Sequence, residues 1–322
     1  MITIKRHRRK DKMNTGKDKK IRGIVLTLLG GILWGFCGSC GQFLFQFKEV
    51  NSDWLVPIRL TGAGLLILIV LWIKERKKIF EVWTNPAGRR DILIFSLFGM
   101  MLCQYAYFTT IQYSNAGTAT VLQYTGPAMI LVWICLRMRR KPKLYEIIAL
   151  LCSMAGTFIL ATHGNVSQLA IPAKALLWGL LAAVALVVYT LQPAELMKKY
   201  TTIQTLGWGM FVGGGVLMLL RRPWNVHPVV DGQTVLAMAV IILLGTICAF
   251  YFYLQGVQLV GASNASMLAC VEPVAATVIS VVWLHVEFQM MDLLGFIFVL
   301  STVFIVSINQ KKEEEGVRSN GR

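Results

Sequence analysis

A single glutamate, Glu272, stands inside a long apolar stretch near residues 262 to 285. An acidic group in apolar surroundings is costly to keep, and such groups commonly bind a proton, a cation or a substrate. A structural alternative is a hydrogen-bonded Glu272 beside Pro273, because proline lacks an N–H and leaves a backbone carbonyl free. Both interpretations stay open, and we take a proton-binding, coupling role for Glu272 as the prediction.

Arg59 is the other charged residue inside an apolar segment. It could pair with the carboxylate of a substrate. It lies only a few residues from the start of its segment, however, where a long side chain can extend to the polar boundary. An anchoring role, or an ion pair with Asp53 or Glu287, is therefore the favoured interpretation of Arg59.

Uncharged polar residues recur on two apolar segments at the i, i+4, i+7 spacing of one helical face. The two stripes are Tyr105, Thr109 and Gln112 in one segment and Tyr251, Gln255 and Gln258 in the other. Polar faces in an apolar medium turn towards protein or water. We predict that these stripes line a central cavity, together with Trp34, Gln42, Tyr189 and Asn264. The alternative is hydrogen bonding between helices.

Motifs of other protein classes are missing from the sequence. It contains no His-Glu-x-x-His, no Gly-x-Ser-x-Gly, no Asp-rich metal pair and no P-loop. We therefore expect no enzyme activity, no metal and no cofactor. The net charge of +16 does not predict nucleic-acid binding, because the basic residues occur in blocks between apolar runs rather than across a folded surface.

The elements that carry these residues are long apolar runs. Of 322 residues, 56% are hydrophobic and only 15% are charged, which is typical of a membrane protein. A membrane-spanning helix needs about 20 residues. Ten runs meet this length, and the fold class is therefore all-α, with ten transmembrane helices. They lie near 22–46, 54–73, 91–112, 116–136, 144–162, 173–191, 203–220, 234–256, 262–285 and 290–309.

The distribution of Lys and Arg predicts the orientation. Of the 32 basic residues, 27 fall in the two tails and in the connections that share one side of the membrane. Basic connections stay cytoplasmic. We expect a multi-pass protein of the cytoplasmic membrane whose basic tail 1–21 and C-terminal tail 310–322 are both cytoplasmic, with anionic lipid as a partner of the first tail.

The chain also repeats itself at an offset of 146 residues. This offset places Tyr105 on Tyr251, Tyr107 on Tyr253 and Pro127 on Pro273. Two five-helix repeats follow, 22–163 and 172–309, and the matched prolines predict kinked helices. Because five is odd, the second repeat enters the membrane from the opposite side, and such inverted repeats are typical of alternating-access transporters.

Several motifs resemble the EamA-type transporters of the drug/metabolite transporter superfamily. They are Leu33-Trp34-Gly35, Pro57-Ile-Arg59-Leu60, the Ala-Ser-Asn-Ala-Ser segment at 262–266, Glu272-Pro273, Glu287 and Leu294-Gly295. The resemblance implies movement of a small metabolite, often an amino acid or a related compound, and often outward. The sequence departs from the family pattern at Lys141, where an acidic residue is usual.

The predicted function is thus export of a small organic solute such as an amino acid or an amine, with aromatic residues favouring a cationic one. A channel or facilitator without ion coupling is the alternative. Gly31 and Gly35 have the spacing of a helix-dimer motif, so a homodimer is a further alternative, although packing within one bundle is the commoner use of such a pair.

Overall fold

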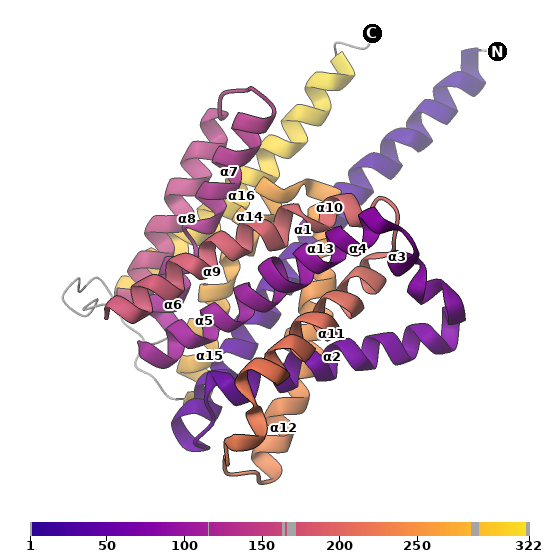
Figure 1. The fold of residues 1–322 in the computed structure, drawn as a ribbon. Helices are drawn as coiled ribbons and strands as arrows, with labels where there is room; N and C mark the ends of the chain where they lie inside the picture. Colours follow the sequence, from indigo (N-terminus) through magenta and orange to yellow (C-terminus); the bar gives the residue numbers. More distant parts are fainter. Residues whose placement is uncertain (1, 115, 163–164, 166–171, 285–289, 320–322) are drawn as a thin grey trace.

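The computed structural model describes residues 2–114, 116–162, 165, 172–284 and 290–319, and throughout these residues the regular structure is helical (Figure 1). The elements of the first half are α1 (Ile2–Phe47), α2 (Ser52–Glu75), η1 (Arg76–Phe80), α3 (Glu81–Thr84), α4 (Pro86–Ile94), η2 (Phe95–Met101), α5 (Leu102–Tyr113), α6 (Ala116–Gln123), α7 (Gly126–Arg137) and α8 (Leu144–Thr162). Those of the second half are α9 (Ala173–Leu191), α10 (Pro193–Leu196), α11 (Thr202–Arg221), η4 (Pro223–Asn225), α12 (Gly232–Val240), η5 (Ile241–Cys248), α13 (Ala249–Val260), α14 (Ala262–Leu268), η6 (Ala269–Val271), α15 (Glu272–Leu284) and α16 (Met290–Ser319).

Seven helical stretches in the described part of the chain are long and apolar enough to cross a membrane. They are Asp18–Phe47, Ser52–Glu75, Pro86–Tyr113, Ala119–Arg137, Ala173–Leu196, Thr202–Arg221 and Gly232–Val260. Leu144–Ile159 and Leu293–Val306 are shorter apolar helices at the predicted fifth and tenth spans. The predicted ninth span is divided into α14, η6 and α15, and its residue 285 lies outside the described residues.

Side-chain caps explain where several helices begin. The Asn51 side chain accepts a hydrogen bond from the Trp54 N–H at 3.0 Å, and Asp231 accepts one from the Thr234 N–H at 2.9 Å. Such a cap satisfies a backbone donor that has no partner inside the helix. At the other end of α13, Gly261 has a φ of +83°, a conformation that glycine adopts without steric cost. These residues fix the ends of the helices that carry the site.

The helix boundaries repeat at a constant offset. The starts of five elements in the first half have counterparts in the second half that lie 146 residues later. These pairs are Pro86 with Gly232, Phe95 with Ile241, Ala116 with Ala262, Gly126 with Glu272, and Leu144 with Met290. The pair that begins at Phe95 and Ile241 is a π-helix in both halves. An uncommon structure at matched positions indicates that the two halves share a folding pattern as well as aligned residues.

The main helix contacts join one half to the other. Helix α2 packs on α11, α8 on α16, α1 on α13 and α5 on α9. Glycines allow the closest of these crossings: a Cβ added to Gly64 would lie 2.3 Å from the Phe211 nitrogen, and one added to Gly214 would lie 2.4 Å from the Thr61 nitrogen. Small residues at helix crossings are typical of membrane bundles, because packing rather than water exclusion holds these helices together.

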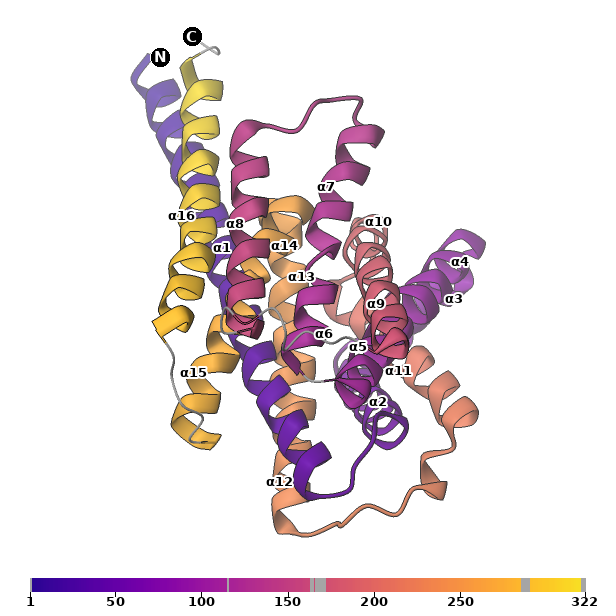
Figure 2. The same ribbon diagram turned by 90° about the vertical axis from the view of Figure 1, so that its left-hand side faces the viewer.

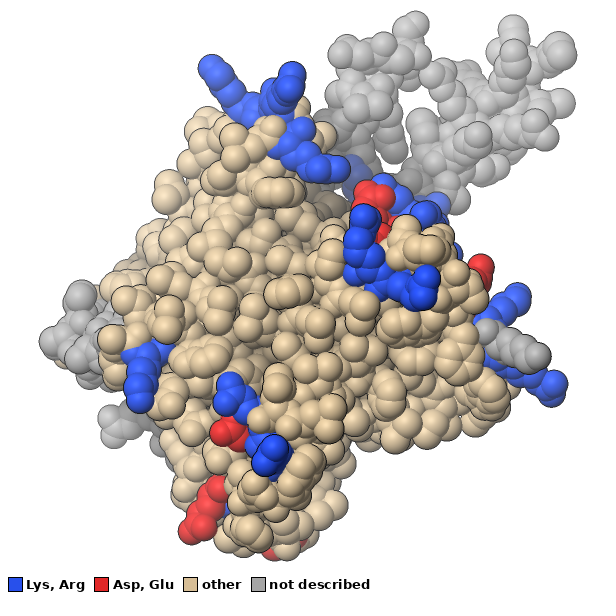
Figure 3. Space-filling model, in the orientation of Figure 1, with Lys and Arg blue, Asp and Glu red and all other residues tan. Residues whose placement is uncertain are grey.

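Most charged side chains lie near the ends of the bundle, and Arg59 and Glu272 are exceptions in its interior. In Figure 3 Lys and Arg form separate groups at the top, at the right and in the lower left part of the visible face, and the wide surface between these groups is composed of other residues. The start of α1 and the end of α16 lie at the same end of the molecule in Figures 1 and 2, next to the α7–α8 connection, whereas the α1–α2 and α11–α12 connections lie at the opposite end. The arrangement is that of a multi-pass membrane protein with most of its charged residues near two boundaries.

Gly31 and Gly35 pack inside the chain. A Cβ on Gly31 would lie 2.9 Å from the Ala269 carbonyl oxygen, and one on Gly35 would lie 2.5 Å from that of Glu272. The face of α1 on which the dimer alternative rested is thus occupied by η6 and α15 of the same chain.

Candidate functional site

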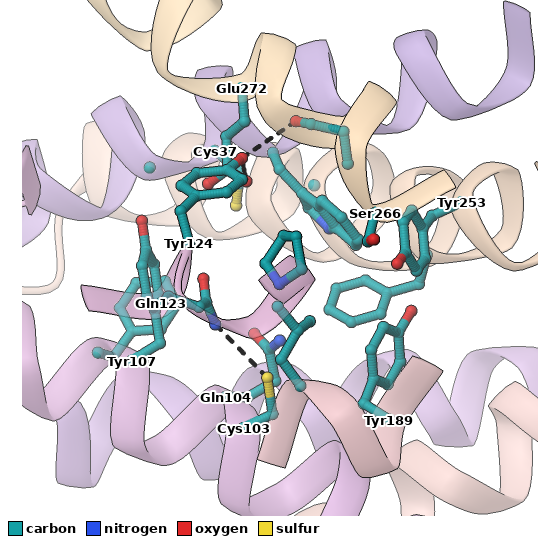
Figure 4. Close-up of a pocket in the computed structure, with 18 of the residues that line it drawn as sticks. Cys37, Cys103, Gln104, Tyr107, Gln123, Tyr124, Tyr189, Tyr253, Ser266 and Glu272 are labelled. Carbon is teal, nitrogen blue, oxygen red and sulfur yellow. Dashed lines mark hydrogen bonds between the residues drawn. The ribbon is translucent and has the colours of Figure 1, made fainter. Parts of the chain in front are cut away.

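A cavity lies between the two halves and contains both charged residues that the sequence places inside apolar segments. Its walls come from α1, α2, α5, α6, α7, α9, η5, α13, α14, η6 and α15 (Figure 4). The lining residues are Trp34, Cys37, Gly38, Arg59, Cys103, Gln104, Tyr107, Phe108, Gln123, Tyr124, Pro127, Leu186, Tyr189, Gly245, Phe250, Tyr253, Ser266, Ala269 and Glu272.

Glu272 is bound by a tyrosine of the first half. The Tyr124 hydroxyl lies 3.1 Å from a carboxylate oxygen of Glu272 and 3.0 Å from the Ala269 carbonyl oxygen. Figure 4 shows Tyr124 directly beside Glu272. Tyr107 lines the same cavity, and its hydroxyl lies 3.1 Å from that of Thr120. Glu272 is the first residue of α15, so its side chain is positioned where η6 passes into that helix. A carboxyl group held by a phenol from the other half can couple its charge to the relative position of the halves.

The environment of Arg59 differs from the predicted one. Its side chain is buried in the bundle and does not extend to the polar boundary. Its residue is 2% exposed, its guanidinium group donates a hydrogen bond to Gln104, and its Cζ lies 4.5 Å from the centre of the Phe108 ring. The predicted partner Asp53 binds Arg221 and the Tyr105 hydroxyl instead. The other predicted partner, Glu287, lies outside the described residues.

Four aromatic residues form one continuous wall of the cavity. The Trp34 ring lies 5.1 Å from Phe250 and 4.9 Å from Tyr253, and Tyr189 lies 5.5 Å from Phe250 and 5.9 Å from Tyr253, measured between ring centres. The contacts of Phe250 are edge-to-face, a favourable geometry for aromatic rings. Trp34 and Tyr189 were predicted cavity residues, and the structure brings them together.

The two predicted polar stripes are absent from the cavity lining. Tyr107 and Tyr253 face it instead, and since each is two residues, or about 200° of helix, from Tyr105 and Tyr251, the stripes point elsewhere. In both halves the stripe contacts the start of the preceding long helix: Thr109 donates to Ser52 at 3.3 Å, and the Gln255 amide donates to Thr202 at 2.7 Å.

The other stripe residues follow the same arrangement. The Gln112 side-chain oxygen accepts hydrogen bonds from the backbone N–H and the hydroxyl of Ser52, at 3.1 and 2.7 Å. Tyr251 contacts the Phe252 ring, and Gln258 is exposed. The alternative that polar stripe residues bond helices together describes the geometry of Tyr105, Thr109, Gln112 and Gln255.

Four other predicted residues differ in their placement. Gln42 and Asn264 do not line the cavity, and the Asn264 amide donates to the Val260 carbonyl at 3.0 Å. Pro127 lines the cavity near the start of α7, whereas Pro273 is buried at the matched position of α15. Both prolines occupy the first turn of a helix, where a missing N–H costs nothing, and each follows a break in its span.

Sequence reasoning missed several lining residues. Cys37 is three residues after Trp34 and therefore shares its helical face, a signal that was available. Tyr107 and Tyr253 were matched by the repeat, yet only the direction of their helices in space shows that they face inward. Tyr124 had no comparable signal, because its position in the turn between α6 and α7 depends on the break in the span.

A separate polar cluster joins the α1–α2 and α11–α12 connections at one end of the bundle. The Lys48 ammonium group lies 2.5 Å from an Asp231 carboxylate oxygen and 2.9 Å from the Gln233 side-chain oxygen. The Lys48 hydrogen bond, with those from Thr234, lowers the pKa of Asp231. The Val229 N–H also donates to the Lys48 carbonyl at 3.1 Å. We call Lys48, Asp231 and Gln233 the end latch, because they tie the first half to the second.

Comparison with known proteins identifies the family. The profile of the EamA-like transporter family matches residues 21–162 and again residues 173–308. The chain belongs to the EamA-like transporter family. It is 36% identical over 291 residues to YicL of Salmonella typhimurium, described as an uncharacterized inner membrane transporter, covering 90% of this chain and 97% of that one.

More distant relatives agree with this assignment. YetK of Bacillus subtilis, described as an uncharacterized transporter, is 24% identical over 80% of this chain and 78% of its own. A solved crystal structure aligns with a TM-score of 0.73 over 92% of this chain and 99% of its own, at 15% identity, and so supports the fold alone. The EamA-like chain is thus a membrane transporter, and transport rather than catalysis is the function to test.

Proposed function

We propose that this EamA-like protein is a secondary transporter that exports a small organic solute, such as an amino acid or an amine, across the cytoplasmic membrane by alternating access. The observation that carries the proposal is the cavity between the two halves, where Glu272 of one half is held by Tyr124 of the other. A charged residue kept within an apolar bundle at an interface between repeats suits a transport site.

The proposed architecture has ten transmembrane helices in two inverted five-helix repeats, 22–163 and 172–309. It is supported by the constant offset of 146 residues between helix starts and by the reciprocal packing of α1 on α13 and α5 on α9. Ten crossings would leave both termini on one side, and the basic connections favour the cytoplasm. Two halves related in this way can tip about the cavity and open it to each side in turn.

Glu272 is the proposed coupling residue. Its partner Tyr124 belongs to the turn after α6, so that movement between the halves would change the hydrogen bond that stabilises its charged form. The other ionisable groups lining the cavity are Arg59, Cys37, Cys103, Tyr107, Tyr189 and Tyr253. Proton binding at Glu272 would then favour one conformation, which links solute export to the proton gradient.

The test uses purified protein in liposomes and a panel of radiolabelled amino acids and amines. Wild-type protein is expected to accumulate a panel solute against its gradient when a pH difference is imposed. Glu272→Gln should keep exchange of solute between the two sides and lose gradient-driven accumulation. Glu195→Gln, which alters an exposed ion pair with Lys198, is the control and should behave as wild type.

Unchanged accumulation in Glu272→Gln would refute the coupling role. If wild-type protein shows only downhill flux, with no exchange and no dependence on pH, the alternative of a channel or facilitator would be favoured. A channel does not reorient a binding site between the two sides, so its flux requires neither exchange nor proton binding.

A further inference from the structure

Three residues that line the cavity each carry a buried hydrogen-bond donor that has no partner among the described residues. These donors are the Nε–H of Arg59, the Nε1–H of Trp34 and the hydroxyl of Tyr189. The two nitrogen groups can only donate, and a tyrosine hydroxyl can do so. A buried donor without an acceptor is costly, so that unmatched donors in a ligand cavity indicate the chemistry of the missing ligand. Here the ligand must supply acceptor oxygens.

The charge of Arg59 indicates that these oxygens carry a negative charge. In the described part of the chain no carboxylate lies within ion-pair distance of its guanidinium group, which donates a hydrogen bond to the Gln104 side chain. Asp53 is engaged by Arg221 and Tyr105, and Glu272 by Tyr124. A buried guanidinium group without a counter-charge is unfavourable, and an anionic ligand would balance it.

The arrangement of the donors favours a carboxylate on an apolar body. Trp34 and Arg59 both line the cavity, and so does Cys37, which lies three residues after Trp34 on the same face of α1. Beyond Trp34 the wall is formed by Phe250, Tyr253 and Tyr189. The fork of a guanidinium group matches a carboxylate. A doubly charged phosphate would be poorly balanced by one arginine in a cavity that also contains Glu272.

We propose that Arg59 binds the carboxylate of the transported solute, with the Trp34 and Tyr189 donors facing the same ligand and the aromatic wall contacting its apolar part. This inference rests on the proposed transport function and narrows its substrate class: the solute carries a carboxylate, and a simple amine lacking one is excluded. It also assigns Arg59 a binding role in place of the anchoring role that its position in the sequence favours.

The experiment measures the apparent melting temperature of the purified full chain in detergent against three matched sets of probes at constant ionic strength. The sets are phenylacetate with phenylacetamide, indole-3-acetate with indole-3-acetamide, and L-phenylalanine with its amide and with phenethylamine. A ligand that binds the folded state raises the melting temperature by mass action. In at least one set the carboxylate should stabilise the wild-type protein in a saturable manner, and its amide and amine should not.

Variants then assign the effect to the residue. Arg59→Gln should weaken binding of that carboxylate by roughly ten- to a hundredfold, as expected for a lost charge-assisted hydrogen-bonded pair. Arg59→Lys keeps the charge and loses the forked guanidinium group, so its affinity for the carboxylate should lie between those of wild type and Arg59→Gln. Arg89→Gln, at an exposed position of α4, is the control and should bind as wild type. The melting temperature without ligand, compared across variants, verifies that each of them is folded.

Two results would overturn the inference. One is that no carboxylate in the three sets stabilises the wild-type protein more than its amide does; the other is that Arg59→Gln binds the carboxylate as tightly as the Arg89→Gln control. The proposed transport function is tested separately by flux in liposomes. If phenethylamine is transported equally by wild type and Arg59→Gln, the transport function is supported and the proposal of a carboxylate substrate is refuted. If a carboxylate binds in an Arg59-dependent manner but no solute is transported, the transport function alone is refuted.

Discussion

Replacing Gly214 by alanine places a methyl group where α11 crosses α2. The new Cβ would lie 2.4 Å from the Thr61 nitrogen and 2.9 Å from the Leu60 carbonyl carbon, which are backbone atoms that cannot rotate away. The helices must move apart, and overpacking of this kind costs about 1–3 kcal/mol. Alanine also favours the helix over glycine by about 1 kcal/mol, which offsets part of the cost. We expect a net loss of stability in Gly214→Ala.

The next residue provides the matched control. A Cβ on Gly215 would meet no atom within 4 Å, so that Gly215→Ala gains the helix propensity and loses nothing. The assay is the apparent melting temperature of both purified variants in the same detergent. Gly214→Ala should melt below wild type, and Gly215→Ala at or above it. Equal shifts for the two variants would show that α2 and α11 do not cross at Gly214.

Three more outcomes follow from the contacts. Glu146 is buried and accepts two hydrogen bonds from Arg140, at 2.7 and 2.8 Å. Glu146→Gln should therefore lower the stability by about 1–3 kcal/mol in a melting assay. This loss is smaller than that of a fully buried pair, because Arg140 is partly exposed. Because Lys48 lowers the pKa of Asp231, the end latch stabilises the fold above about pH 4 and loses this effect as the pH falls further. Asp231→Asn should therefore have a lower melting temperature than wild type at pH 7. The difference between the two melting temperatures should shrink below pH 4. Cys37 lines the cavity and Cys270 does not, so a bound probe carboxylate should protect Cys37, and leave Cys270 unaffected, in labelling with N-ethylmaleimide followed by peptide mapping.

Local patterns were sufficient for the positions of the long helices. Apolar continuity is a property of consecutive residues, and seven of the predicted spans coincide with helices that are long and apolar enough to cross a membrane. The offset of 146 residues, visible in a few aligned tyrosines and prolines, recurs in the helix boundaries. The break within the ninth predicted span could not be read from hydropathy, because α14, η6 and α15 are all apolar.

The direction of individual side chains was less accessible. A helical stripe shows which residues share a face but not which neighbour that face meets. The stripe that begins at Tyr105 contacts the start of α2, and Tyr107, two residues away, reaches the cavity. The environment of Arg59 likewise depends on Gln104 and Phe108 of another helix. Glu272 was easier to place, because it lies well inside its apolar segment, where a carboxylate facing lipid would be costly.

Sided labelling of Cys37 tests alternating access most directly. The protein would carry Cys37 as its only natural cysteine, together with cysteines introduced at positions 48 and 231 of the end latch. A membrane-impermeant maleimide would be applied to either face of oriented vesicles. Labelling would be compared before and after a short bismaleimide has joined the two introduced cysteines. We predict that Cys37 reacts from both faces in the free protein, and that the cross-link abolishes labelling from the face bearing the latch while the opposite face still labels. Labelling of Cys37 from both faces with the latch cross-linked would contradict the account, because the cavity would then be open to both sides at once.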